Sequence, residues 1–413
     1  MASRFTASVL ALILTGIAQG QTIAQLVPAP GSASSAAGVP GSAVAYQSGT
    51  ATLPAVDCFT ATPTVDAGRR IWGGAEYLLW WVEGQRVPAL VSTTPLGAAP
   101  SEAGVIGVPG TSVLFGDSRP NDGGRSGVRM TIGAWLDTCR TCGVGGEFFI
   151  LCNQGDDFTV RSTGVPILAR PFFNTLTGTA DAQLVAFPEL ASGAISAFVE
   201  SQLLGASGFF RHVVRSGCDY SVEGLAGYRY LNLNERVTVD EQVVPVQNSA
   251  TFLVHDSFQT QTQFHGGDIG LAGYLTRGRL TFSAMGKVGI GVNVRDLRVD
   301  GSTGINVPGQ LPLYFDGGLL TAGRTGHTSD SVFALVPEFR LGTGYQITDC
   351  IRLTAGYNLI VWTNVARAAE QIDVNLNPNQ LPPPLIPVIA QTPSIRDTTI
   401  WVQGLSLGLL FNY

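Results

Sequence analysis

Hydrophobic and polar residues alternate one by one along several long stretches of the chain. In the stretch 350–373, apolar residues such as Leu353 occupy one parity, whereas polar residues such as Arg352 occupy the other. Successive side chains of a β-strand point to opposite faces, so this pattern predicts a strand with one apolar and one polar face. The same alternation occurs over 280–295 and 333–347.

The lengths of the strands and of their connections predict the fold class. Each alternating stretch spans roughly 16 to 22 residues, whereas strands of soluble domains cluster at about 5–6. Short turns alternate with long connections, which is typical of outer-membrane barrels. The short turns are 137–143, 216–219, 277–278 and 348–350, and the long connections are 84–124, 164–192, 238–258, 299–330 and 374–397. We therefore predict an all-β fold, a transmembrane antiparallel up-and-down β-barrel with short periplasmic turns and long extracellular loops.

The pattern predicts about ten strands in this barrel. They begin near Arg70, Arg125, Gly143, Gly193, Tyr220, Gln259, Arg279, Ser331, Cys350 and Asp397. A hairpin hidden in one of the long loops would raise the count to twelve. An even number of strands puts both ends of the barrel in the periplasm.

The last strand of the predicted barrel alternates to the final residue. Leu405, Leu407 and Leu409 share one face with the chain end, and glycine and serine occupy the other. The residues Ser406, Gly408, Phe411 and Tyr413 resemble the C-terminal signal by which barrel-assembly machinery recognises its clients. The usual terminal residue of that signal is Phe, so Tyr413 is a departure. The alternative is a buried terminal strand of a soluble protein.

The N-terminal region has the features of an export signal. Arg4 precedes an apolar run over 7–18, and Ala18-Gln19-Gly20 offers small residues for cleavage. We predict a signal peptide over 1–20, a flexible periplasmic lead-in rich in Ala, Ser, Pro and Gly over 21–68, and a barrel over 69–413. The alternative for the apolar run is a helical membrane anchor, for which it is short.

The polar parity of the strands is expected to face the barrel interior, because a lipid-facing Arg or Lys at the bilayer midplane costs about 2–4 kcal/mol. The predicted lumen-lining residues are Glu76, Arg129, Glu147, Arg211, Glu223, Arg229, Asp268, Lys287, Glu338, Arg340 and Arg352. In one interpretation they line a narrow pore that passes small hydrophilic solutes. In the other they pair across strands and fill the interior. Ten strands favour a narrow lumen, whereas inward glycines would widen it: Gly133, Gly289, Gly291, Gly342, Gly344 and Gly356.

Other chemistry-bearing residues give weaker signals. Five of the six cysteines map to the predicted periplasmic end, where Cys139 and Cys142 offer a disulfide or, alternatively, a redox pair or half a zinc site. The adjacent pair His255 and Asp256 suggests a barrel hydrolase, against the simpler reading of a solvated loop histidine. We predict a protein that is not an enzyme and that uses no cofactor or metal.

Composition sets further limits on the function. Only 13% of residues are charged, about half the usual share of about 25%. The net charge of −6 is spread along the chain, and no basic face for nucleic acid is present. No segment has the roughly 18 unbroken apolar residues of a transmembrane helix.

Several motifs, in order along the chain, resemble one family. They are the segments 72–81, 129–137, 145–149, 170–174 and 225–230, with the sequences WGGAEYLLWW, RMTIGAWLD, GGEFF, RPFFN and LAGYRY. These residues resemble the putative beta-barrel porins of planctomycetes, the seventh numbered family of that kind. The resemblance implies an outer-membrane barrel in contact with outer-membrane lipid and, less directly, passive diffusion of small solutes. The alternative is a closed structural or surface-contact barrel that acts through its extracellular loops.

Overall fold

The computed structural model describes residues 70–413 except 121, 248–249 and 389. The predicted signal peptide, the lead-in and Cys58 therefore lie outside the described residues. Ten antiparallel strands form a closed ring in the order β1 (Ile71–Val82), β4 (Gly124–Trp135), β5 (Cys142–Leu151), β9 (Ala191–Ser216), β10 (Tyr220–Pro245), β11 (Thr251–Arg277), β12 (Leu280–Asn306), β14 (Gly326–Gln346), β15 (Ile351–Ala366) and β17 (Asp397–Asn412). The predicted ten-stranded β-barrel is confirmed.

The C-terminal strand closes the ring. β17 pairs with β1 on one side, from Trp72 opposite Asn412 to Val82 opposite Val402, and with β15 on the other. Its leucines on the outward parity are exposed, as the alternation predicted, whereas Val402 and Ser406 on the inward parity are buried. The backbone of Ile71 and Tyr413 exchanges two hydrogen bonds of 2.7 Å, which ties the first strand to the chain end.

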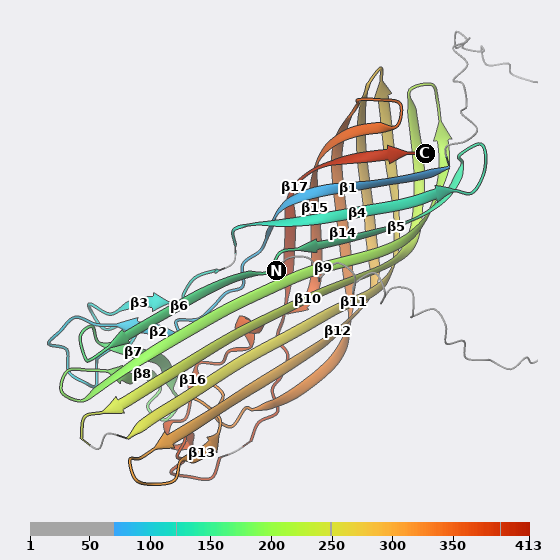
Figure 1. Ribbon diagram of the computed structural model, residues 1–413. Helices are drawn as coiled ribbons and strands as arrows, with labels where there is room; N and C mark the ends of the chain where they lie inside the picture. The colour runs from blue at the N-terminus through green and yellow to red at the C-terminus, as the bar shows by residue number, and fades with distance from the viewer. Residues whose placement is uncertain (1–69, 121, 248–249, 389) are drawn as a thin grey trace, which may run out of the picture. The chain divides into compact units, whose positions relative to one another are not determined.

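One side of the ring extends well beyond the other. β9 to β12 contain 26 or 27 residues each, whereas β1 and β4 contain 12. Figure 1 shows these long strands continuing past the ends of β1 and β4. β6 (Gln154–Ser162) follows β5 along the same edge of β9 and lengthens this wall. β13 (Leu313–Asp316) pairs with the end of β12.

The long wall corrects the predicted loop at 238–258. β10 continues to Pro245 and β11 begins at Thr251, so most of that loop is strand. The outward parity of this stretch is mostly polar, with Asp240 and Gln242, so it lacks the continuous apolar outer face of the strand ends near the short turns. Its inward parity still carries buried residues such as Val239, which pack on the segments that cover the wall.

The long connections fold into a second, smaller sheet. It contains β2 (Val91–Thr93), β3 (Ser112–Phe115), β7 (Leu168–Asn174), β8 (Thr179–Ala186) and β16 (Asn375–Leu376). Two short 3₁₀ helices accompany it, η1 (Ala368–Gln371) and η2 (Pro378–Gln380). Leu90, Leu168 and Leu376 from these segments share one buried apolar cluster with Val237 and Leu297 of the long wall. The loops therefore share a core with the long wall.

The outer face of the ring carries an apolar band. Along β11 the outward residues run from Leu275 through Leu271 and Ile269, and then change to Gln263 and Gln261. The band therefore covers the half of the barrel nearer the short turns. The half of the long wall farther from the short turns lies outside the band. Among residues 70–413 as described, no helix is long and apolar enough to cross a membrane.

Candidate functional site in the barrel interior

The structure places all eleven predicted lumen-lining residues on the inward parity of the strands. Nine of them border a cavity of about 920 Å³. The lining of this cavity also includes Arg140, Asp349 and Asn412, which lie beside the short turns, so the cavity is a vestibule at that end. The remaining two, Arg229 and Glu338, are buried and do not line the cavity.

Glu338 on β14 is the centre of an ion-pair network across four strands. Its carboxylate lies 2.5 Å from Arg229 on β10 and 3.2 Å from Lys287 on β12, and it also pairs with Arg340. Asp268 on β11 contacts the same two cations, Arg229 at 2.9 Å and Lys287 at 3.3 Å. The charges that the alternation brought inward are therefore paired with one another.

The remaining charges of the vestibule form separate pairs. Arg129 lies 2.5 Å from Glu76 on the adjacent strand and donates a 2.8 Å hydrogen bond to the side-chain oxygen of Asn358. Arg340 also pairs with Glu147, and Arg211 pairs with Glu223. Arg352 differs, because its only described hydrogen bond is from Nε to the amide oxygen of Gln346 at 2.9 Å.

The residues of the predicted assembly signal lie in the closing strand. The hydroxyl group of Ser406 accepts a 3.3 Å hydrogen bond from the Asn358 amide, so this serine is part of the interior network. A Cβ atom at Gly408 would lie 2.5 Å from the Glu76 side chain, so glycine leaves the room that Glu76 needs. Phe411 and Tyr413 continue the outward parity. Recognition of this segment by assembly machinery stays a prediction.

A layer of buried apolar side chains fills the interior next to the charged network. It contains inward residues from eight of the ten ring strands, and each is at most 5% exposed: Leu78, Trp80, Val82, Phe149, Leu151, Leu203, Leu231, Leu233, Phe264, Ala334, Val336, Ile360, Trp362, Val365, Ile400 and Val402. The rings of Trp80 and Phe149 pack with centroids 5.2 Å apart. We call this set the apolar layer. Solvent reaches almost none of the surface of these inward side chains.

The apolar layer was missed from the sequence, although a signal was present. Where the inward parity becomes apolar, both faces of the strand are apolar and the alternation disappears. The runs 78–82 and 359–362 have this character, with Leu-Leu-Trp-Trp-Val and Leu-Ile-Val-Trp. Continuous apolar runs are expected of strands that are buried on both faces.

The prediction that inward glycines widen the lumen is wrong at the positions where neighbours take their space. A Cβ atom at Gly289 would lie 3.2 Å from the Phe264 ring and 3.3 Å from Val336. A Cβ atom at Gly133 would lie 2.1 Å from the Trp72 ring. These glycines therefore make room for large side chains from adjacent strands.

Buried ion pairs also hold the segments that cover the long wall. Arg367 lies 2.7 Å from Glu235 of β10 and donates a 2.7 Å hydrogen bond to the backbone oxygen of Glu83. Arg170 of the small sheet lies between Glu241 at 3.2 Å and Asp256 at 2.8 Å. Burial raises the pKa of the Glu241 carboxyl, and the charge of Arg170 opposes that rise. Buried charges thus tie these segments to the inner side of the long wall.

The structure separates the residues that gave the weaker sequence signals. Cys139 and Cys142 are free thiols in the structure, so the disulfide offered for them is absent. Cys142 instead lies 3.1 Å from Nδ1 of His212, and Cys218 is disulfide-bonded. Among the described residues, no group of three His, Cys, Asp or Glu is placed to hold a metal ion.

His255 and Asp256, which the sequence offered as a pair, point to opposite faces of β11. Neighbouring residues of β11 face opposite sides, so Asp256 is buried against Arg170. His255 lies on the outer surface, 2.7 Å from Asp240. The two side chains therefore cannot act together.

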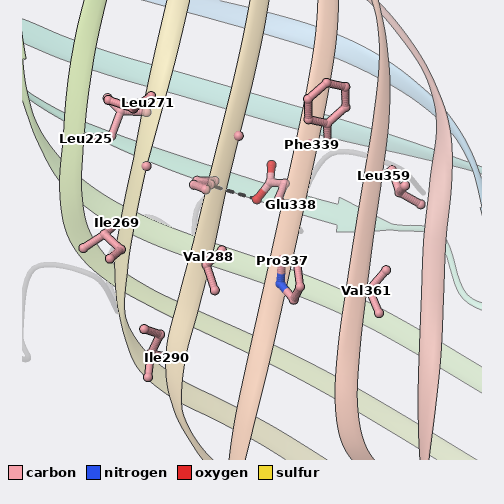
Figure 2. Close-up of a pocket in the computed structure, with 13 residues that line it drawn as sticks. Leu225, Ile269, Leu271, Val288, Ile290, Pro337, Glu338, Phe339, Leu359 and Val361 are labelled. Atoms are coloured by element: carbon pink, nitrogen blue, oxygen red, sulfur yellow. Dashed lines mark ion pairs between the residues drawn. The ribbon is translucent and has the colours of Figure 1, made fainter.

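The outer face of the charged region is apolar. Figure 2 shows Ile269, Val288, Pro337 and Phe339 around a shallow groove, while Glu338 turns to the other side of the sheet toward Lys287. The groove runs across β11, β12 and β14 inside the apolar band. One strand thus presents apolar residues outward and a paired charge inward.

A family model, but no curated protein, matches the chain. Residues 72–413 match the protein family described as "Putative beta barrel porin-7". No curated protein sequence matches the chain. The crystal structure of the outer membrane protease OmpT from Escherichia coli is similar, with a TM-score of 0.38 and 8% identity over 85% of this chain and 98% of that one. A Pseudomonas aeruginosa FadL homologue has a TM-score of 0.21 and 10% identity over 84% of this chain and 90% of that one.

Proposed function

The chain belongs to the family described as putative beta barrel porin-7 and is an outer-membrane β-barrel, and from this premise we propose that its lumen is closed. In this proposal the protein acts through the folded segments at the end with the long connections, without catalysis. Diffusion through the barrel is not its function. The short turns face the periplasm, and the small sheet faces the outside of the cell.

The observation that carries the proposal is the apolar layer. Side chains such as Trp80, Phe264 and Trp362 are at most 1% exposed, although they point to the middle of the barrel. A water-filled pore would give these inward side chains contact with solvent. Hydrophobic constrictions oppose ion passage even when they are wider than an ion, because water leaves them. The pairing of the charges in the network agrees with a structural role.

The opposite end of the barrel supports a contact function. Long connections that fold into a sheet and share a core with the long wall have a fixed surface to present. Large apolar side chains stand exposed at their tips, with exposed fractions of 87% for Leu311, 75% for Tyr314 and 82% for Leu385. Exposed apolar side chains at loop tips favour contact with other macromolecules of the cell surface.

The second candidate function is the passive diffusion of small hydrophilic solutes. The vestibule of about 920 Å³ favours it, because charged residues line it and it opens at the short-turn end. For this candidate the apolar layer would have to move aside. The two functions therefore differ in one measurable property, the conductance of the folded barrel.

The test is a recording of single-channel currents in planar bilayers. Protein that migrates as a folded barrel before heating is incorporated, and a known open porin serves as the control for the membrane. We expect no conductance steps from the folded chain at any voltage that the bilayer tolerates. Regular ohmic steps would overturn the closed lumen and favour the diffusion function.

A further inference from the structure

The vestibule contains one more cation than carboxylates. Five carboxylates lie in its lining, Glu76, Glu147, Glu223, Asp268 and Asp349. Six cations accompany them: Arg129, Arg140, Arg211, Lys287, Arg340 and Arg352. The extra positive charge can be assigned to a residue, because the ion pairs in the network are specific.

That residue is Arg352 on β15. Among the described residues no carboxylate lies within ion-pair distance of its guanidinium group, unlike Arg129, Arg211 and Arg340. Gln346 accepts a hydrogen bond from Nε and so holds the guanidinium group in place. Its two terminal nitrogens make no hydrogen bond to a described residue. A guanidinium group presents these two nitrogens in a fork that fits the oxygens of a carboxylate or a phosphate.

The strand beside Arg352 leaves room for its side chain. Gly344 of β14 is in register with Thr354 of β15, and a Cβ atom at Gly344 would lie 2.6 Å from Cδ of Arg352. Arg352 therefore extends over the glycine and reaches the vestibule. Thr281 of β12 pairs with the same glycine, and its hydroxyl oxygen lies 3.3 Å from that of Thr276. These hydroxyl groups also line the cavity.

We propose that the vestibule is a binding site for a small oxyanion, a carboxylate or a phosphate, which the fork of Arg352 holds from the short-turn side. This inference rests on the closed lumen, because a vestibule that ends at the apolar layer retains a ligand instead of passing it on. The hydroxyl groups of Thr276 and Thr281 offer further donors on the same wall. The ligand enters from the periplasm and returns there.

The test measures binding by the full-length folded barrel in detergent micelles. Inorganic phosphate and acetate are titrated separately by calorimetry at low ionic strength, which distinguishes the two kinds of oxyanion. We expect Arg352→Gln to bind its anion about tenfold more weakly or worse than the parent protein, as loss of a charge-assisted pair of hydrogen bonds predicts. Equal affinity in the two proteins, or binding of neither anion by the parent protein, overturns the site.

Two further variants keep the test decisive if Arg352→Gln does not fold. Gly344→Ala keeps every charge but places a methyl group against the Arg352 side chain, so it should weaken binding while the barrel stays folded. Arg277→Gln is the matched control, because Arg277 is an exposed arginine at the same end, paired with Asp219 at 2.9 Å and outside the cavity lining. It should bind as the parent protein does. An equal loss of binding in Arg352→Gln and Arg277→Gln would show a nonspecific effect of positive charge and refute the site.

The outcome can be separated from that of the proposed function. A conducting barrel that keeps binding dependent on Arg352 refutes the closed lumen alone. A silent barrel that binds neither phosphate nor acetate refutes the binding site alone.

Discussion

The aromatic ring of Phe264 on β11 lies 3.2 Å from the position that a Cβ atom would take at Gly289 on β12. The glycine is thus one half of a packing pair, and its missing side chain is replaced by a ring from the neighbouring strand. Val336 of β14 approaches the same position to 3.3 Å. Three adjacent strands meet at this point, so it is a sensitive place to test whether the interior is packed.

Gly289→Val should therefore destabilise the barrel. The added side chain forces Phe264 and Val336 out of their positions, and overpacking of a filled interior typically costs about 1–3 kcal/mol. The free energy of unfolding, measured with denaturant in detergent micelles, should fall by this amount. The control is Gly208→Val on the outward face of β9, where a Cβ atom has no neighbour within 4 Å. If both variants are equally stable, the interior is not packed as described.

The strands were predictable because their chemistry is local. The alternation, the closing strand around Ser406 and the ten-stranded ring all follow from which residues face lipid and which do not. The partners inside the barrel were not predictable in this way. Glu147 and Arg340 are 193 positions apart, yet they form an ion pair across the lumen. A single sequence specifies that both side chains point inward, but not which strands face each other.

The closed lumen predicts a barrel that can be opened by substitution. Trp80→Ser combined with Phe264→Ser removes two large rings from the apolar layer and adds hydroxyl groups that hold water. We expect ionic conductance from the folded double variant in planar bilayers, where the parent protein gives none, since a hydrophobic constriction conducts once it is wetted. Each substitution should also cost several kcal/mol, in the range of about 3–5 for loss of a buried aromatic side chain.

The control for this experiment is Trp81→Ser. Trp81 follows Trp80 in β1 but lies on the outward parity, so the same change there leaves the apolar layer intact. It should fold and remain silent. Conductance from Trp81→Ser, or silence from a double variant that folds, would contradict the assignment of the block to the apolar layer.

The extent of the long wall was also outside the reach of the sequence patterns. Over 238–258 most outward residues are polar, as in a loop, and the strand is revealed by buried inward residues such as Val243 and Val254. Those residues pack on segments from distant connections, including Leu168 and Leu376. A strand whose apolar partner comes from elsewhere in the chain cannot be distinguished locally from a polar loop.

The network around Glu338 predicts that breaking a buried ion pair lowers the free energy of unfolding much more than breaking an exposed one. Glu338→Gln removes the negative charge that Arg229, Lys287 and Arg340 share. Breaking a buried pair leaves an uncompensated charge, at a cost of about 3–5 kcal/mol. Asp219→Asn, which breaks the exposed pair with Arg277, should cost about 0–1 kcal/mol. The free energies of unfolding of both variants, measured under the same conditions, check the prediction, and equal costs would contradict the buried network.

A carboxylate in the first short turn predicts a dependence of stability on pH. The Thr141 hydroxyl group, followed by the backbone N–H groups of Cys142 and Thr141, donates hydrogen bonds to Asp137 and lowers its pKa from 3.8 to about 2. A depressed pKa in the folded state means that the carboxylate stabilises the fold above pH 4, and that this contribution is lost as the pH falls from about 4 through about 2. Asp137→Ala should therefore be less stable than the parent protein at pH 6, and the difference should shrink toward pH 2.

Thr141→Val removes the strongest donor, so the pKa of Asp137, followed by NMR, should rise toward its ordinary value. A stability difference that stays constant between pH 6 and pH 2 would show that the turn does not depend on the charge of Asp137.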